Sequence, residues 1–247
     1  MFDLTGRVGI VTGASSGIGY ATANVLAQAG ATVYAISRSG AVKDKDAFVH
    51  ENIVHIKGDI CDNQRMEEIV QEIGERDGID ILINNAGITV KTRADELTSE
   101  EFDRVQKVNV NGMFWLSRLC YPYLKASKHV GRIVNISSMA AHLGFSQVVP
   151  YCASKSAVLG LTRGLAIEWT HDNITVNSIA PGWYPSELSK QVMDEDRRQK
   201  ILNRIPMHKF GDTKDLGAMA QFLLSDSAAY ITGCDFPVDG GALAFGF

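Results

Sequence analysis

Two side chains with complementary acid–base chemistry lie four residues apart in the second half of the chain. Tyr151 and Lys155 form the pattern Y-x-x-x-K. In a helix this i, i+4 spacing places both side chains on one face. A free tyrosine has a pKa of about 10, and a neighbouring ammonium favours the phenolate. We therefore expect the pKa of Tyr151 to be lowered, which would make its proton available nearer to neutral pH.

A glycine-rich stretch follows the first apolar run of the sequence. It reads Thr12-Gly13-Ala14-Ser15-Ser16-Gly17-Ile18-Gly19, a T-G-x-x-x-G-x-G pattern. Gly13 permits a tight turn, Gly17 lets the backbone approach a pyrophosphate, and Gly19 allows the next helix to pack closely on the strand. The amides and partial positive charge of the helix N-terminus then face an anion. The pattern predicts a dinucleotide-binding loop, with contacts assigned to Gly13, Ser15, Ser16, Gly17, Ile18 and Gly19.

The end of the second expected strand indicates which dinucleotide binds. An Asp or Glu there would hydrogen-bond a ribose 2′-hydroxyl and repel a 2′-phosphate. The chain instead has Ser37, which adds no repulsion, and Arg38, whose guanidinium can contact a phosphate through two hydrogen bonds. We predict a preference for NADP(H), with NAD(H) as the alternative. Lys43 and Lys45 follow and could assist.

Alternating strands and helices must position these residues. Apolar, β-branched runs predict strands at residues 8–12, 32–37, 53–57, 79–84, 132–137, 174–180 and 235–238. Helices are expected at residues 18–29, 64–76, 100–125, 151–169 and 215–224. Such alternation is typical of parallel βαβ units with right-handed crossovers. The predicted fold class is α/β: a single doubly wound Rossmann domain over residues 1–247, with a seven-stranded parallel sheet and helices on both faces.

Local signals refine two segments. Thr98 and Glu101 form a T-x-x-E capping box at the start of the third expected helix, and Pro122 is expected to bend its last turn. After the sixth strand, a proline-containing and charged stretch interrupts the alternation. Ligands of open α/β sheets bind beyond the carboxyl ends of the strands. We therefore predict a substrate lid at about residues 182–209, with a solvated surface helix as the alternative.

Composition excludes several classes of protein. The chain has 247 residues, 45% of them apolar and 21% charged, which is typical of a globular protein. A net charge of −4 argues against nucleic-acid binding, because no basic face would track phosphates. No apolar run is long enough to cross a membrane, and the first residues do not read as a signal peptide. Four cysteines without metal-binding spacing predict free thiols in the cytoplasm and no metal site.

The motifs taken together resemble those of the short-chain dehydrogenase/reductase family, in its compact branch, over essentially the whole chain. In order they are the glycine loop of residues 12–19, Asn84-Asn85-Ala86-Gly87 after the fourth strand, Asn109 in Val108-Asn109-Val110, Ser138 after the fifth strand, Tyr151 with Lys155, and Pro181-Gly182. The resemblance implies a ketone–secondary alcohol oxidoreductase that acts by hydride transfer, similar to 3-oxoacyl-[acyl-carrier-protein] reductases and to sugar-acid or polyol dehydrogenases.

The resemblance also implies catalytic roles. Tyr151 would be the general acid in carbonyl reduction and the general base in alcohol oxidation. Ser138 would hydrogen-bond the carbonyl oxygen and hold it near the phenol. Lys155 would lower the pKa of Tyr151 and bind the nicotinamide-ribose hydroxyls. Asn109 would hold a water in a proton relay from Lys155 to solvent.

Further cofactor contacts follow from the same resemblance. Asp59 and Ile60 would border the adenine. Small residues, Asn85, Ala86 and Gly87, would pass close to the adenosine ribose and pyrophosphate, while Pro181 and Gly182 would turn the chain under the nicotinamide, and Ser186 would offer a hydroxyl where the family often has Thr. Ser16 departs from the family pattern, because many relatives that use NADP have a basic residue there.

The expected substrate pocket mixes apolar and polar groups and leaves the substrate open. Its predicted contacts are Ser138, His142, Phe145, Trp183 and Tyr184, with Met139, Leu143, Gln147 and Val148 as further walls. His142 is expected to be a wall or surface side chain rather than a catalytic group. Lys91 and Arg93 would be a small basic patch for an acyl-carrier protein, whereas segments 183–187 and 240–244 resemble sugar-acid and polyol dehydrogenases.

Two further expectations concern function and assembly. The alternative to an enzyme is a dinucleotide-binding regulator that has lost catalysis, although this chain keeps Asn109, Ser138, Tyr151 and Lys155. The resemblance implies a homotetramer, with a dimer as the second choice. Helices 100–125 and 151–169 would pair across a two-fold axis, and the C-terminal strand region would form a second interface.

Overall fold

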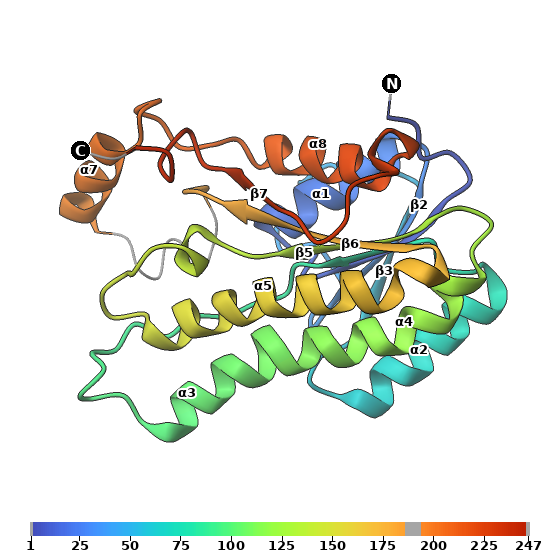
Figure 1. Cartoon of the computed structure of the whole chain (residues 1–247), viewed down its shortest axis with the longest axis horizontal. Coiled ribbons are helices and arrows are strands. Elements are labelled where there is room, and N and C mark those ends of the chain that lie inside the picture. The colour runs from blue at the N-terminus through green and yellow to red at the C-terminus, as the bar shows by residue number, and fades with distance from the viewer. Residues whose placement is uncertain (1, 186–193, 246–247) are drawn as a thin grey trace.

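The computed structural model describes residues 2–185 and 194–245 (Figure 1). A single sheet crosses the molecule. Its strands are β1 (Val8–Thr12), β2 (Thr32–Ser37), β3 (Ile53–Lys57), β4 (Ile81–Asn84), β5 (Gly131–Ile136), β6 (Ile174–Pro181) and β7 (Asp235–Val238). They are all parallel, in the order β3-β2-β1-β4-β5-β6-β7. The predicted seven-stranded, doubly wound α/β fold is confirmed.

Helices cover both faces of the sheet, as Figure 1 shows. Helices α1 (Gly17–Gln28) and α8 (Thr213–Leu224) lie on one face, and α2 (Asn63–Arg76), α4 (Met113–Ala126) and α5 (Val149–Trp169) lie on the other. The core accordingly has two apolar layers. One packs β1, β2 and β4 residues such as Val11, Val33 and Ile83 against α1 and α8. The other packs Ile10, Leu82 and further strand residues against α2, α4 and α5. Strands buried on both faces explain why the sequence shows continuous apolar runs.

The third expected helix differs from its prediction in one respect. It is divided into α3 (Ser99–Gln106), a π-helical segment η1 (Lys107–Gly112) and α4. The capping box at its start is confirmed, because the Thr98 hydroxyl accepts from the Glu101 amide and the Glu101 carboxylate accepts from the Thr98 amide. Pro122 lies inside α4, which continues to Ala126. A π-helical turn adds one residue to the hydrogen-bonded ring, and no apolar period in the sequence marks it.

Shorter segments complete the described chain. The 3₁₀ helices η2 (Met139–Ala141), η3 (Thr170–Asp172) and η4 (Asp226–Ala228) follow β5, α5 and α8, and helix α7 (Glu195–Arg204) lies in the predicted lid segment. No helix of the described residues is long and apolar enough to cross a membrane.

Two buried arginines at the amino-terminal edge of the sheet contact the ends of α8 and of the following 3₁₀ helix η4. Arg7 is 2% exposed and donates to the Leu224 carbonyl over 3.2 Å, while Arg132 is fully buried and donates to the Ala228 carbonyl over 3.0 Å. Cations are favourable beside the partial negative charge at a helix C-terminus. These contacts fill the amino-terminal edge of the sheet, whereas the opposite edge carries the cavity described below.

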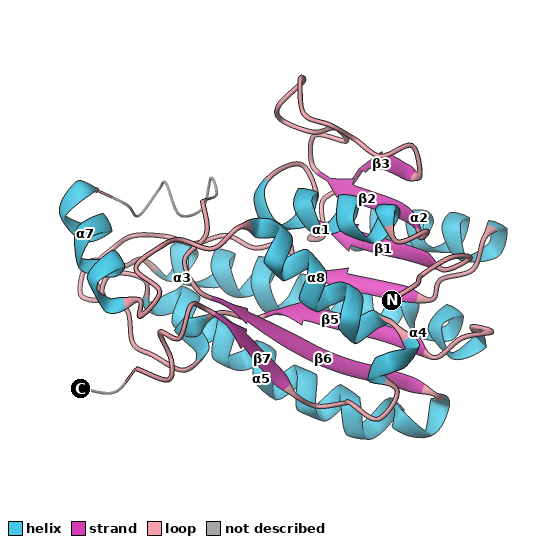
Figure 2. Ribbon diagram, turned by 90° about the horizontal axis from the view of Figure 1, so that it is seen from above, coloured by secondary structure: helices cyan, strands magenta, loops and turns pink. Residues whose placement is uncertain are grey.

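That opposite edge is where the carboxyl ends of all seven strands meet (Figure 2). The chain reverses its direction across the sheet between β1 and β4, because β2 and β3 lie on one side of β1 and the later strands on the other. Loops leaving neighbouring strands in opposite directions create a crevice at such a switch point, and ligands of open α/β sheets bind there.

Candidate active site

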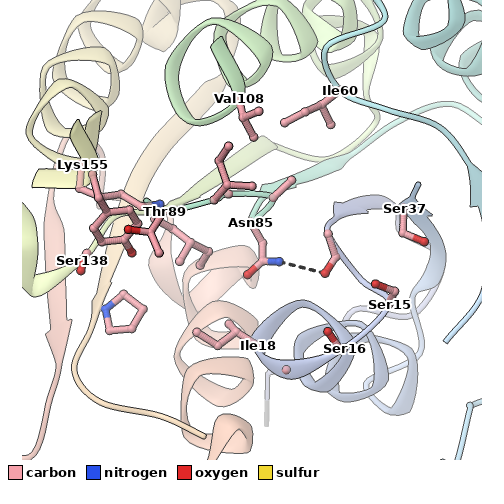
Figure 3. Close-up of a pocket in the computed structure, with 18 of the residues that line it drawn as sticks. Ser15, Ser16, Ile18, Ser37, Ile60, Asn85, Thr89, Val108, Ser138 and Lys155 are labelled. Atoms are coloured by element: carbon pink, nitrogen blue, oxygen red, sulfur yellow. Dashed lines mark hydrogen bonds between the residues drawn. The ribbon is translucent and has the colours of Figure 1, made fainter. Parts of the chain in front are cut away.

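A cavity of about 1080 Å³ occupies this crevice. It is lined by the loop after β1, by residues at the carboxyl ends of β2, β4, β5 and β6, and by the start of α5 (Figure 3). Of the predicted cofactor residues, those among its walls are Gly13, Ser15, Ser16, Gly17, Ile18, Ser37, Arg38, Asp59, Ile60, Asn85, Ala86, Gly87, Tyr151, Lys155, Pro181 and Gly182. Its volume is at the upper end of the range for small-molecule pockets.

The glycine loop has the geometry that a bound pyrophosphate requires. Gly13 and Gly17 have φ angles of +66° and +55°, in the left-handed region that favours glycine. Gly19 is buried behind the loop rather than in the cavity wall. A Cβ at Gly19 would lie 2.5 Å from the Gly13 carbonyl oxygen. Helix α1 therefore begins directly beneath the turn, with its first amides directed towards the cavity.

The loop after β4 is attached to the glycine loop by hydrogen bonds that sequence analysis missed. The Thr12 hydroxyl accepts from the amides of Asn85 (3.0 Å) and Ala86 (3.1 Å). The Asn85 side-chain amide donates back to the Thr12 carbonyl over 2.9 Å. Figure 3 shows Asn85 directed towards the glycine loop. These bonds give Thr12 a structural role, which its place at the start of the motif could have indicated.

Ser138, Tyr151 and Lys155 come together at one end of the cavity. Ser138 lies in extended backbone just after β5 and accepts a hydrogen bond from the Ala140 amide over 3.1 Å. Its hydroxyl also hydrogen-bonds the Tyr151 phenol. Lys155 is 4% exposed, and its ammonium lies over the Tyr151 ring, 5.5 Å from the ring centroid. Its Nζ donates to the Ile136 carbonyl over 2.6 Å.

The structure does not show the lowered pKa that was expected for Tyr151. Burial of the phenol raises the pKa of Tyr151, and this effect outweighs the opposing hydrogen bond from Ser138. Burial also lowers the pKa of Lys155 to about 8. The Lys155 ammonium faces the ring of Tyr151 rather than its hydroxyl and donates to the Ile136 carbonyl. This explains why the ammonium does not dominate the pKa of Tyr151. The phenol is therefore protonated at neutral pH and can donate a proton.

Asn109 lies on the π-helical segment and is fully buried. Its Oδ1 accepts from the Ile88 amide over 2.8 Å, and its Nδ2 donates to the Ile88 carbonyl and to the Ser154 hydroxyl. Asn109 thus joins the loop after β4 to α5. A Cβ added to Gly87 would lie 3.3 Å from Asn109 Oδ1 and 3.8 Å from Lys155 Nζ, so Gly87 lies next to both side chains. The water that the predicted relay needs stays a prediction.

Among the described residues, four cations line the cavity besides Lys155: Arg38, Lys43, Arg104 and Lys107. The amide of Lys43 donates to the Ser15 carbonyl over 2.9 Å, which brings the loop after β2 against the glycine loop. Arg38 and Lys107 both act electrostatically on the Cys61 thiol, so they flank the same part of the cavity. Sequence analysis missed Arg104 and Lys107. Arg104 and Lys107 are three residues apart, so a helix places them near one face. This spacing, just before Asn109, could have indicated them as cavity residues.

The substrate end is walled by apolar and aromatic side chains. Phe145 and Trp183 pack edge to face with ring centroids 6.0 Å apart, and Met139 and Val148 lie in the same wall. Tyr184 also lines the cavity, but its hydroxyl donates to the Val238 carbonyl over 2.9 Å.

Three predicted residues of the substrate pocket, His142, Leu143 and Gln147, are not among the described residues that line the cavity. His142 is absent from the lining, and its ring nitrogen Nε2 instead hydrogen-bonds Asp235 at 2.7 Å. Sequence analysis expected His142 to be either a pocket wall or a surface side chain, and its side chain is 35% exposed. Ser186 lies outside the described residues. Residues 2–185 and 194–245 contain no cluster of side chains that could hold a metal ion.

Comparison with known proteins agrees with this architecture. Residues 13–242 match the family model described as enoyl-(acyl carrier protein) reductase. The chain is 36% identical over 247 residues to 2-dehydro-3-deoxy-D-gluconate 5-dehydrogenase of Dickeya dadantii, covering 98% of each chain. It is 37% identical over 245 residues to the 3-oxoacyl-[acyl-carrier-protein] reductase FabG of Rickettsia prowazekii, covering 98% of this chain and 99% of the relative.

A solved structure is similar as well. The gluconate 5-dehydrogenase of Burkholderia cenocepacia, in complex with NADP and tartrate, superposes with a TM-score of 0.90 at 29% identity, over 99% of this chain and 98% of that one. A doubly wound sheet with a glycine loop and a Ser–Tyr–Lys site defines a class of dinucleotide-dependent oxidoreductases. The chain belongs to the short-chain dehydrogenase/reductase family.

Proposed function

We propose that the chain is an NADP(H)-dependent oxidoreductase that interconverts a ketone and a secondary alcohol. The observation that carries the proposal is the convergence of Ser138, Tyr151 and Lys155 at one end of a cavity whose other end is the glycine loop at the N-terminus of α1. An isolated nucleotide-binding function would require the glycine loop but not these three side chains.

The residues suit a proton transfer coupled to hydride transfer. NADP(H), when bound, supplies the hydride to the carbonyl carbon or accepts it in the reverse direction. Tyr151 donates its phenolic proton to the carbonyl oxygen in reduction and accepts the hydroxyl proton in oxidation. The Ser138 hydroxyl, which is bonded to the phenol, holds the same oxygen in place. The Lys155 ammonium favours the phenolate that forms when Tyr151 gives up its proton.

The preference for NADP(H) rests on charge at the end of β2. Ser37 and Arg38 both line the cavity, and the backbone of Lys43 is bonded to the glycine loop beside them. An arginine can bind a 2′-phosphate through two hydrogen bonds, and a second cation would strengthen that contact. The Burkholderia relative, which binds NADP, supports the same assignment. NAD(H) stays the alternative.

The substrate class, location and assembly are further parts of the proposal. Relatives that act on sugar acids or acyl-carrier thioesters leave both classes open, and segment 182–209, which contributes Trp183 and Tyr184 to the cavity, would cover the substrate. The described cysteines are free, in agreement with a cytoplasmic location. A homotetramer is supported by exposed apolar side chains, Trp115 on α4 (40% exposed) and Ile167 on α5 (73%).

Replacement of the phenol tests the reaction. Tyr151→Phe removes the proton donor while leaving the ring, so turnover should fall at least 1000-fold (~4 kcal/mol in the barrier). The dissociation constant for NADPH, measured by fluorescence titration, should change less than about three-fold. The wild-type chain should bind NADPH more tightly than NADH in the same assay.

The reaction should be followed by NADPH absorbance with a panel of ketones, sugar acids, polyols and acyl thioesters. Undiminished turnover of Tyr151→Phe would contradict the catalytic assignment. A wild-type chain that binds NADPH but turns over no member of the panel would instead favour the regulatory alternative. Tighter binding of NADH would overturn the argument from Arg38.

A further inference from the structure

One carboxylate outside the cavity gathers three hydrogen-bond donors around the segment that carries Ser138. Asp235 is the first residue of β7 and pairs in register with Ser178 of β6. Its side chain is 15% exposed. It is not among the residues that line the cavity, so it can influence the reaction only through other groups.

The two carboxylate oxygens of Asp235 have different partners. Oδ1 accepts from the hydroxyls of Ser178 (2.5 Å) and Ser137 (2.8 Å). The single hydroxyl hydrogen of Ser137 can alternatively be donated to the Ile179 carbonyl at 2.9 Å. Oδ2 lies 2.7 Å from His142 Nε2. The His142 side chain is 35% exposed, so it keeps access to solvent while it donates to the carboxylate.

The positions of these donors in the chain show which segment Asp235 holds in place. Ser137 directly precedes Ser138, and His142 directly follows η2 (Met139–Ala141). The carboxylate of Asp235 therefore holds both ends of the short turn that begins at Ser138. Hydrogen bonds to an ionised carboxylate are roughly twice as strong as bonds between neutral groups. Ser156 of α5 adds a weaker contact to the Ala141 carbonyl at 3.3 Å.

We propose that Asp235, acting with His142, is a positioning residue that fixes the Ser138 hydroxyl relative to the Tyr151 phenol. The inference rests on the proposed function in so far as Ser138 takes part in the reaction. It also gives a role to His142, which sequence analysis expected to be a pocket wall or a surface side chain. A misplacement of about 1 Å in a reacting group can cost 100-fold in rate, so loss of the carboxylate should reduce turnover without weakening cofactor binding.

Asp235→Ala is the main test. We expect kcat for NADPH-dependent reduction of ethyl acetoacetate, used as a model ketone, to fall 10- to 100-fold. The dissociation constant for NADPH should stay within two-fold, because the glycine loop is untouched. Hydrogen–deuterium exchange measured by mass spectrometry should speed up at least ten-fold in a peptide that covers residues 138–145, and should not change in the glycine loop.

Asp235→Asn is the conservative variant. Its Oδ1 can still accept from the two serine hydroxyls, and its amide can donate to the neutral His142 tautomer that accepts at Nε2. We expect it to retain kcat within about three-fold. His142→Ala releases one end of the turn only and should lower kcat three- to ten-fold. It keeps the proposal testable if Asp235→Ala does not fold.

Asp172→Ala is a matched control. Asp172 is also a partly buried carboxylate that joins two elements, accepting from Tyr121 Oη and pairing with Lys125 Nζ at 2.7 Å each. It does not line the cavity, so its loss should leave kcat within two-fold.

Unchanged exchange in residues 138–145 of folded Asp235→Ala, or of His142→Ala if the former does not fold, would overturn the proposal. So would a kcat for Asp235→Ala within two-fold of the wild type. If the wild type reduces no ketone, the proposed function fails, but the exchange experiment still decides whether Asp235 holds the turn.

Discussion

At the scale of single residues, the burial of an ammonium has an energetic consequence that can be measured. Lys155 is 4% exposed, and burial lowers its pKa to about 8 from the usual 10.5. An unfolded chain therefore binds more protons than the folded one between these two values, and stability must rise with pH across that window. Below pH 8 the folded state carries the full cost of the buried charge.

Lys155→Met tests this cost. The free energy of unfolding of the wild type should increase relative to that of the variant by roughly 3 kcal/mol as the pH rises from 7 to 10.5. The quantity compared is the change with pH of the difference in unfolding free energy between the wild type and Lys155→Met. The difference at a single pH would also include the Ile136 carbonyl, which Met leaves without its donor. Urea denaturation at several pH values measures it.

Lys125→Met is the control for the sign of the pH dependence of stability. The pKa of Lys125 is raised by its contact with Asp172, so its contribution to stability is present below its unfolded pKa and is lost as the pH rises through the folded value. This variant should show no relative gain of the wild type between pH 7 and 10.5. A pH-independent difference between the wild type and Lys155→Met would contradict the assignment of a buried, easily deprotonated amine.

The catalytic side chains could be found from sequence, but the electrostatics around them could not. Motif order indicated Ser138, Tyr151 and Lys155, and the structure brings all three to one end of the cavity. The i, i+4 spacing did not show that Lys155 would face the ring of Tyr151, nor that burial would dominate both pKa values. Burial depends on which distant strands cover a side chain, and local spacing carries no such information.

At the scale of elements, the contact between the glycine loop and α1 depends on the absence of one side chain. A Cβ at Gly19 would lie 2.4 Å from the Asn85 side-chain nitrogen as well as 2.5 Å from the Gly13 carbonyl oxygen. Neither distance is compatible with a real methyl group, so the loops after β1 and β4 would have to separate. The amides that face the cavity would move with them.

Gly19→Ala should therefore weaken NADPH binding at least 100-fold and destabilise the fold by about 1–3 kcal/mol, as overpacking typically does. Isothermal titration and thermal denaturation measure the two effects. Gly160→Ala is the matched control, because Gly160 lies in α5 with nothing within 4 Å of its added Cβ. Its cofactor affinity should be unchanged. Equal affinities for NADPH in Gly19→Ala and the wild type would show that the loop tolerates the displacement.

Element boundaries followed the sequence closely, with one informative exception. Apolar runs and the capping box predicted the strands and the start of α3 to within about two residues. The π-helical segment that carries Asn109 was not predicted. We attribute its extra residue to the contacts of Asn109 with Ile88 in the loop after β4 and with Ser154 in α5. A tertiary contact therefore decides the local helix type.

At the scale of the whole molecule, exposed apolar side chains on α4 and α5 indicate where copies of the chain would meet. Ile167 is 73% exposed and Trp115 is 40% exposed. Assembly over these residues would bury them, and a charge introduced there would be buried without a partner. The fold of one subunit would be little affected, since exposed positions outside special contacts usually change stability by about 0.5 kcal/mol or less.

Ile167→Glu should convert the proposed tetramer into smaller species at micromolar concentration, as measured by sedimentation velocity. Phe48→Glu is the control, because Phe48 is also apolar and 63% exposed but lies in the segment between β2 and β3. It should not change the sedimentation coefficient. A monomeric wild type, or an Ile167→Glu protein that stays assembled, would contradict the proposed interface.

The order of the strands along the chain has a consequence for folding during synthesis on the ribosome. β1 emerges first yet lies in the interior of the sheet, and β7, which emerges last, contributes the Asp235 that contacts Ser137 and His142. A nascent chain released only as far as β4 contains the glycine loop but lacks α8, which packs against α1. The turn that begins at Ser138 can be held at both ends only after Asp235 of β7 has also been released.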